Sequence, residues 1–462
     1  MRRRPGRLLW LALLCAACAQ ELEEGDPLPP GRFHYPTGVA LTPEIEGVPE
    51  RVLVVSANTD LRFRAGRVHA FDREALDRLV DEAVASCVGE DCPIPEVTDL
   101  SPALVGSVEI GSLAGEIAVT PLEGPGLPPL RAFVPVRGTR TVTAVDLDAE
   151  GIRCSRLDGR CTEGQAGFAR EDPFVVAAEL GMVFVGNGTL FRDENGAVGF
   201  APATAPFWET GGGAFSLVGI GSSAVGGLAV GNCRSEEGRP TCTLFANGRS
   251  SREAQRIFAF DFTRDAVPAS PVFSRNVASQ QDGMDSRGIA ISPSMPWAYL
   301  ALRSPDALAV VDVSRMPHLP SDGCLLPEDV ELPPGIGCPD LPPPRDDRPA
   351  FSTIALSPAP DRPLTVAVIE RETPSGERSD LVAMTTSRSV AFFDALTAAQ
   401  VGNVLGVGSG PSGIAVGRRG EGVRLYVPSF ERSTLAVIDL PDLFRPDLAR
   451  VVARLGQPRE ED

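Results

Sequence analysis

A group of three short apolar segments, separated by residues that favour turns, recurs about seven times along the chain. The copy nearest the C-terminus is the clearest, with a turn and strand at residues 410–416 (GPSGIAV), a second strand at 425–427 and a third at 435–439. Short apolar runs bounded by Gly, Pro and Asn indicate β-strands. One such group cannot bury both of its faces alone, whereas copies stacked around an axis can. The repeat therefore predicts an all-β chain that forms a single β-propeller of seven four-stranded blades.

The repeat also places each blade in the sequence. We expect the first strands of the seven blades at residues 36–41, 117–119, 174–177, 227–230, 288–291, 366–368 and 414–416. Residues 351–356 are expected to form the outer strand of the fifth blade, although they could instead open the sixth. Since the first blade begins with an inner strand and the last ends with an outer one, we expect ring closure to depend on apolar packing without a shared strand.

This repeat resembles that of the YVTN-type propeller family, which reads roughly Pro-x-Gly-Ile-Ala-Val, then Leu-Tyr-Val-x-Asn, then Val-x-Val-Ile-Asp. The resemblance covers about residues 35–456 and is strongest in the first, fifth and seventh blades. In the seventh blade, Pro428 and Ser429 stand where the family often has asparagine. The resemblance implies the propeller architecture. It does not imply one activity, because a scaffold of this kind carries varied functions.

The N-terminus has the pattern of an export signal. Four arginines within the first seven residues precede an apolar stretch and then the sequence CAAC, which ends at Cys18 and resembles a bacterial lipoprotein box. We therefore predict a lipoprotein signal peptide at residues 1–17 and lipidation of Cys18. Cleavage after Ala19 by an ordinary signal peptidase is the alternative.

These signals predict an exported protein whose N-terminal lipid binds a membrane. We expect anchoring to the outer membrane, on its periplasmic side or on the cell surface. Residues 18–32, rich in Glu and Pro, are predicted to form a flexible tether. The propeller is expected at residues 33–457 and a disordered tail at 458–462.

The remaining cysteines fall into four close pairs, as expected for disulfides in short loops of an exported protein. We predict the pairs Cys87–Cys92, Cys154–Cys161, Cys233–Cys242 and Cys324–Cys338. Zinc is the alternative, but no histidine lies near any pair in the sequence, and the spacings match no zinc ribbon. Each disulfide would close a short loop and hold that loop in place.

The charged residues limit the function further. The net charge is −18, and every one of the 43 basic residues is an arginine. A chain without lysine has no Schiff-base lysine and no phosphate-binding P-loop lysine. So acidic a chain is also a poor candidate for nucleic-acid binding.

Arginines gather in the predicted turns between the second and third strands of each blade. In a closed propeller these turns share one face, and converging guanidinium groups suit carboxylates, phosphates or sulfates. An anionic small molecule or glycan is therefore a possible partner, whereas solvated turns are the alternative. The candidate anion-binding residues are Arg62, Arg64, Arg137, Arg140, Arg192, Arg249, Arg303, Arg388 and Arg432.

The opposite face is predicted to carry the long connections. The longest are residues 73–103, 147–172 and 314–350. Residues 73–86 are predicted to include a short helix, because apolar residues recur there at helical spacing. Long loops often carry binding functions, so this face is a candidate surface for a protein partner.

No catalytic signature appears in the sequence. It contains no zinc-binding HExxH, no nucleophile GxSxG and no haem-binding CxxCH motif. We predict no catalytic residue, metal ligand or cofactor. Asn58, Asn187 and Asn247 follow second strands and would suit a lactonase-type metal site, but asparagine is also common at such turns. His69 is expected to be a packed strand residue.

The favoured function is therefore a non-enzymatic, lipid-anchored binding module of the cell envelope. One alternative is a lactonase-like or lyase-like enzyme with a metal at the propeller axis. Another is a scaffold subunit of an envelope complex.

Overall fold

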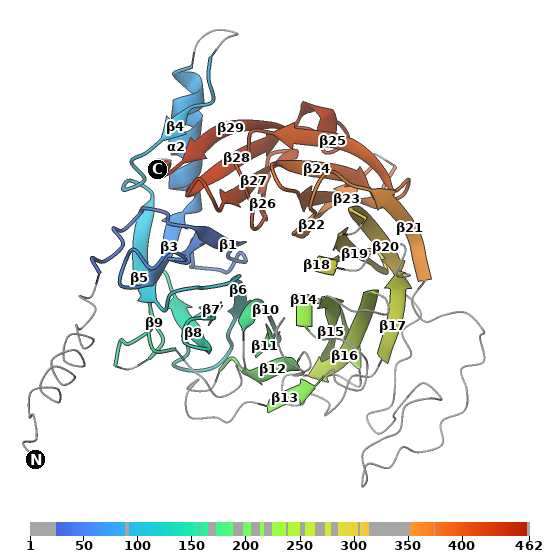
Figure 1. Cartoon of the computed structure of the whole chain (residues 1–462), viewed down its shortest axis with the longest axis horizontal. Helices are drawn as coiled ribbons and strands as arrows, with labels where there is room; N and C mark the ends of the chain where they lie inside the picture. Colours follow the sequence, from blue (N-terminus) through green and yellow to red (C-terminus); the bar gives the residue numbers. More distant parts are fainter. Residues whose placement is uncertain are drawn as a thin grey trace, which may run out of the picture.

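The strands of this chain form seven sheets, six of four strands and one of five, which follow one another around a central axis (Figure 1). The innermost strand of each sheet comes first in the sequence. This arrangement is the predicted seven-bladed β-propeller. The computed structural model describes residues 25–459 except 88–91, 157, 165–171, 188–196, 205–212, 217–223, 237–238, 250–254, 264–272, 279–284, 304, 314–351 and 374.

The first four blades span the N-terminal part of the ring. Blade one contains β1 (Pro36–Leu41), β2 (Arg51–Ser56), β3 (Gly66–Asp72) and β5 (Leu104–Ile110). Blade two contains β6 (Ala118–Pro121), β7 (Leu130–Val136), β8 (Thr141–Leu147) and β9 (Ile152–Cys154). Blade three contains β10 (Pro173–Glu179), β11 (Met182–Asn187), β12 (Ala197–Pro202) and β13 (Gly213–Ser216). Blade four contains β14 (Ala224–Glu236), β15 (Arg239–Arg249), β16 (Gln255–Thr263) and β17 (Phe273–Ala278).

Three further blades complete the ring. Blade five contains β18 (Asp285–Ile291), β19 (Trp297–Arg303), β20 (Ala307–Asp312) and β21 (Ser352–Pro358). Blade six contains β22 (Val366–Glu372), β23 (Arg378–Thr385), β24 (Ser389–Asp394) and β25 (Ala399–Leu405). Blade seven contains β26 (Ala415–Arg419), β27 (Gly422–Ser429), β28 (Thr434–Leu440) and β29 (Arg450–Leu455). All seven predicted blades are confirmed, and β21 is the outer strand of blade five.

The core lies between neighbouring blades, which explains why the middle strands are continuously apolar. All six residues of β2 (RVLVVS) are buried. Val52 and Val54 pack against blade seven, whereas Leu53 and Val55 pack against blade two. A strand covered on both faces buries every side chain. Burial of each aliphatic side chain stabilises the folded state by about 1.5–3 kcal/mol.

Glycines at or just before the inner strands are required by the close approach of blades at the axis. A Cβ on Gly38 would lie 3.1 Å from the Cα of Glu116 in blade two. A Cβ on Gly288 would lie 2.7 Å from the carbonyl oxygen of Leu364, and one on Gly115 would meet the backbone of Phe174 still more closely. A side chain at these positions would push neighbouring inner strands apart.

The aspartate that ends many third strands pairs with an arginine of the same blade. The pairs are Arg51–Asp72, Arg131–Asp146, Arg234–Asp261, Arg371–Asp394 and Arg424–Asp439. In blades one, two and seven, the two residues are direct partners across the strand ladder, and the ion pair is 2.7 Å long. The final Asp of the repeat therefore has a structural role.

A helix from blade one packs against blade seven and closes the ring. The predicted helix at residues 73–86 is confirmed as α2 (Arg73–Ala85), and Asp72 accepts a hydrogen bond from the backbone of Ala75 at its start. Its buried residues Leu76 and Val80 join the apolar layer between blades one and seven. The helix thus extends the apolar core across the contact between blades one and seven.

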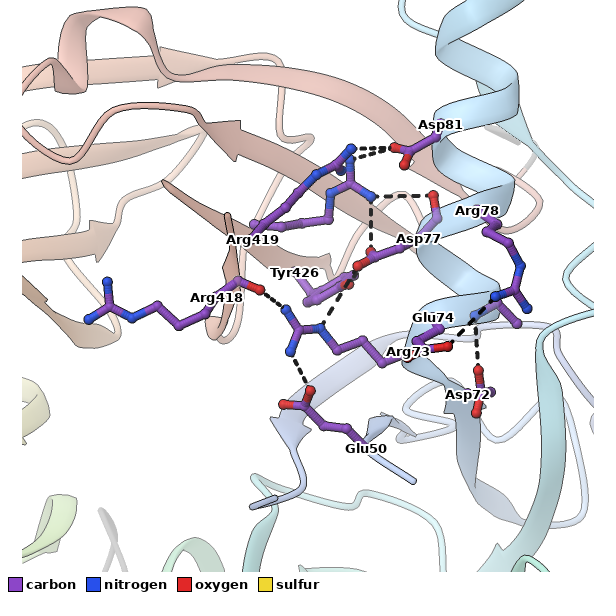
Figure 2. A network of polar contacts seen from close by, with 12 residues as sticks. Glu50, Asp72, Arg73, Glu74, Asp77, Arg78, Asp81, Arg418, Arg419 and Tyr426 are labelled. Carbon is purple, nitrogen blue, oxygen red and sulfur yellow. Dashed lines mark hydrogen bonds and ion pairs between the residues drawn. The ribbon is translucent and has the colours of Figure 1, made fainter. Parts of the chain in front are cut away.

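The polar side of α2 adds ion pairs to this contact. The buried Arg424 of β27 donates hydrogen bonds to Asp77 and Asp81, each 2.9 Å long. Tyr426 also donates to Asp77 (Figure 2). Arg73 reaches the backbone carbonyl of Arg418. Two turns of one helix therefore hold β26 and β27.

The chain then returns along the outer edge of blade seven. There β4 (Glu96–Val97) pairs in parallel with β29, which gives this blade its fifth strand. The expectation of closure without a shared strand is therefore wrong. A closing insertion, consisting of α2 and β4, adds charged contacts and backbone hydrogen bonds to the apolar packing.

Both chain ends described in the structure lie against the ring. Leu28, in the predicted tether, is buried, and the backbone N–H of Gly31 donates to His69 Nδ1 at 3.2 Å. The backbone N–H of Arg459, in the predicted tail, donates to the carbonyl oxygen of Arg432 at 3.0 Å. The packed part of the chain therefore begins before residue 33. The predicted signal peptide and Cys18 lie outside the described residues, and no helix of the described ranges is long and apolar enough to cross a membrane.

Candidate anion-binding site

Seven of the nine predicted anion-binding arginines have described side chains. All seven lie in, or at the start of, connections between second and third strands, which share one end of the ring. They are Arg62 and Arg64 before β3, Arg137 and Arg140 before β8, Arg303 at the end of β19, Arg388 before β24 and Arg432 before β28. Arg192 lies outside the described residues, and for Arg249 only the backbone is described.

Several of these arginines are engaged within the protein. Arg64 forms an ion pair of 2.8 Å with Glu109, and Arg137 forms one with Asp172. Arg303 donates from Nε to a backbone carbonyl at 2.8 Å, and burial lowers the pKa of its guanidinium. These three side chains already have partners.

Two of the predicted arginines meet a third at one pocket between blades six and seven. Arg388 comes from the β23–β24 turn, Arg432 from the β27–β28 turn and Arg454 from β29. The pocket has a volume of about 300 Å³. Its remaining lining comes from Gly406, Gly408 and Ser409 in the connection from β25 to blade seven.

Arg454 is held in place by the backbone. Its Nε and Nη2 donate to the carbonyl oxygen of Gly406 at 3.2 and 2.8 Å. Its Nη1 lies 4.0 Å from Glu96 of the closing insertion. Burial lowers the pKa of Arg454, and the positive charge of Arg432 lowers it further. Arg454 was not predicted, because an arginine on an outer strand carries no turn signal.

The connection along the pocket needs glycine. Gly406, Gly408 and Gly410 have φ angles of +85°, +96° and +63°, a region that side chains disfavour. In the described part of the chain, the backbone N–H groups of Gly408 and Ser409 donate to no carbonyl. Amides presented by such turns are a common setting for anions.

The two exposed arginines of this pocket have no ion-paired carboxylate in the described ranges. Arg388 and Arg432 are both exposed. No described carboxylate forms an ion pair with either one, and no carboxylate lines the pocket. The pocket is therefore a local positive site on an acidic protein.

The propeller axis contains two smaller cavities, of about 60 and 140 Å³. Glu116 lines both, and burial raises the pKa of its carboxyl to about 7. Asp172 and Arg287 lie at the smaller one, and Arg287 pairs with Asp285 at 2.7 Å. Cavities of this size suit water or a single ion rather than an organic ligand.

The asparagines considered for a lactonase-type metal support local structure. Asn58 has a φ of +50° and donates to the carbonyl oxygen of Phe63 at 2.5 Å. Asn187 donates to a backbone carbonyl of its own strand, and Asn247 donates to Ser286. Within the described ranges, no three His, Cys, Asp or Glu side chains are placed to hold a metal ion.

His69 is a packed strand residue, as predicted. Its side chain is fully buried, and burial lowers its pKa to about 3. Nδ1 accepts from Gly31, and Nε2 lies 3.4 Å from Ser56 Oγ. His34 instead contacts Asp60 at 2.7 Å.

Three of the four predicted disulfides are formed. They are Cys87–Cys92, Cys154–Cys161 and Cys233–Cys242. The fourth predicted pair, Cys324–Cys338, lies outside the described residues, as does the predicted long loop at 314–350. The first disulfide lies between α2 and β4, within the closing insertion.

The fold defines this chain as a β-propeller scaffold with an arginine-lined pocket at one end. No known family model matches the chain, and no curated protein sequence matches it. Among solved structures it is similar to hydrazine synthase of Kuenenia stuttgartiensis, with a TM-score of 0.46 and 10% identity over 91% of this chain and 99% of that chain. A likeness at this TM-score carries no argument about function. The resemblance to YVTN-type propellers stays a prediction.

Proposed function

We propose that this chain is a non-enzymatic binding module of the cell envelope, anchored by a lipid on Cys18. Its ligand is a small anion in the pocket between blades six and seven. The observation that carries the proposal is the meeting of Arg388, Arg432 and Arg454 around one pocket. Guanidinium groups that converge in this way suit carboxylates, phosphates or sulfates.

The electrostatics of the pocket support this proposal. Like charges held together raise the free energy of the empty site, and the lowered pKa of Arg454 reflects both its burial and the charge of Arg432. A bound anion relieves this repulsion. Because the whole chain has a net charge of −18, the pocket also differs in sign from the rest of the protein.

Calorimetric titration with sodium sulfate at low ionic strength tests the proposal. We expect the Arg388→Gln and Arg432→Gln variants each to weaken sulfate binding about tenfold, because each loses a charge-assisted hydrogen bond. Arg62→Gln is the matched control, since Arg62 is an exposed arginine in the corresponding turn of blade one. Equal affinity in all four proteins, or an equal loss in Arg62→Gln, would contradict the proposal.

A further inference from the structure

The charge of the pocket determines the charge of the ligand that fits it. Its lining carries three guanidinium groups and no carboxylate. Glu96, 4.0 Å from Arg454 Nη1, offsets one of the three positive charges. Among the described residues, Arg388 and Arg432 therefore have no ion-paired carboxylate. A dianion neutralises these two guanidinium groups, whereas a monoanion leaves one of them uncompensated.

The donors around the pocket come from several directions. Arg388 and Arg432 are on two different turns, and Arg454 is on an outer strand. A carboxylate presents two oxygens in one plane. A phosphate group presents three strong acceptor oxygens around one atom. The arrangement of donors therefore favours a phosphate group.

The volume of the pocket indicates that the phosphate is part of a larger molecule. About 300 Å³ is at the lower end of the range for small-molecule sites, roughly 300–1,000 Å³. An inorganic ion would leave part of this space to water. The exposed side chains of Arg388 and Arg432 place the opening at the solvent side.

We infer that the ligand of this pocket is a phosphomonoester, bound through its terminal dianionic phosphate by Arg388, Arg432 and Arg454. This inference rests on the proposed function, because it names the class of anion that the same site binds. The organic part of the ester lies toward solvent. Either a soluble metabolite or a membrane lipid with a terminal phosphate can supply this group.

Titration of the full-length, detergent-solubilised protein with methyl phosphate and methyl sulfate distinguishes a phosphomonoester site from a general anion site. The two probes have nearly the same shape, but at pH 7.5 methyl phosphate is mainly a dianion and methyl sulfate is a monoanion. We expect methyl phosphate to bind at least about tenfold more tightly, since it engages one more positive charge. We expect Arg388→Gln and Arg432→Gln to reduce this preference, and Arg62→Gln to keep it.

The pH dependence provides a second measurement. The second ionisation of a phosphate ester has a pKa of about 6, so methyl phosphate is mainly a monoanion at pH 5. Its advantage over methyl sulfate should therefore fall sharply between pH 7.5 and pH 5, whereas the affinity for methyl sulfate should change little.

The outcomes distinguish the inference from the function on which it rests. If both probes bind with equal affinity at pH 7.5 and this binding is lost in Arg388→Gln and Arg432→Gln, the phosphomonoester inference is wrong. The proposed anion-binding function is then retained. Failure of both probes and of sulfate to bind overturns both.

Vesicles identify the source of the phosphate. A Cys18→Ser variant, which lacks the proposed lipid, is incubated with phosphatidylcholine vesicles that contain or lack phosphatidic acid, whose headgroup is a phosphomonoester. Sedimentation that requires phosphatidic acid and is reversed by methyl phosphate supports a lipid ligand. Binding of methyl phosphate without such sedimentation supports a soluble ester.

Discussion

At the scale of single residues, His69 shows how burial decides chemistry. The imidazole lies on β3 with no exposed surface, and its pKa is lowered to about 3. In the unfolded chain the pKa of a histidine is about 6.5. Between these two values the unfolded chain binds a proton that the folded protein does not bind. The contribution of the buried, neutral His69 to stability is therefore complete above pH 6.5 and is lost as the pH falls toward 3.

The His69→Gln variant should remove this dependence. Glutamine can still accept a hydrogen bond from Gly31 but does not titrate. Between pH 7.5 and 4.5, the free energy of unfolding should fall by about 2–3 kcal/mol less in the variant than in the natural protein. Urea unfolding followed by circular dichroism at both pH values measures this. An identical fall in the two proteins would show that His69 does not contribute.

The residues of the candidate site differ in how far the sequence reveals them. Arg388 and Arg432 follow strand ends in a recurring pattern, so their face could be predicted. The sequence cannot show that they share a pocket, because this depends on how blades six and seven are placed. Arg454 lies in a strand and reaches the pocket only through its contact with Gly406. Glu116 likewise looks like an ordinary repeat position until the axis is closed.

At the scale of elements, the blades could be predicted and their closure could not. Each blade follows from local information, since three apolar segments and their turns lie close together in the sequence. The helix α2 also follows from local spacing. Its partners, Arg424 and Tyr426, lie about 350 residues later, and a two-residue strand such as β4 leaves no periodic signal. Contacts between residues so far apart in the sequence form only when the ring is complete.

The closing insertion should contribute measurably to stability. Asp77 accepts hydrogen bonds from the buried Arg424 and from Tyr426. We expect Asp77→Ala to lower the free energy of unfolding by about 2 kcal/mol, because a buried guanidinium loses a charged partner. Glu74→Ala is the matched control on the same helix. Glu74 is 90% exposed and only 3.8 Å from Arg78, so this change should cost less than about 0.5 kcal/mol. Equal losses in urea unfolding would contradict a specific role for the insertion.

At the scale of the whole molecule, the proposed lipid on Cys18 would determine where the propeller is located. The described chain begins packed against blade one, with Leu28 buried, so a lipid on Cys18 would hold the ring close to a membrane. We expect Cys18→Ser to move the protein from the membrane fraction to the soluble fraction of the cell envelope, because it removes the acylated side chain. Immunoblotting of separated fractions measures this, with Arg62→Gln, an exposed arginine of the ring, as the control variant. Retention of Cys18→Ser in the membrane fraction would refute the anchor.

The closing insertion also has a consequence for a chain that is synthesised from its N-terminus. Helix α2 is complete early, but Leu76 and Val80 lack the part of their apolar cover that comes from blade seven, and Asp77 lacks Arg424, until blade seven is present. A truncated polypeptide therefore exposes the apolar side chains of Leu76 and Val80, which the complete protein buries. The full burial of these side chains therefore requires both ends of the ring.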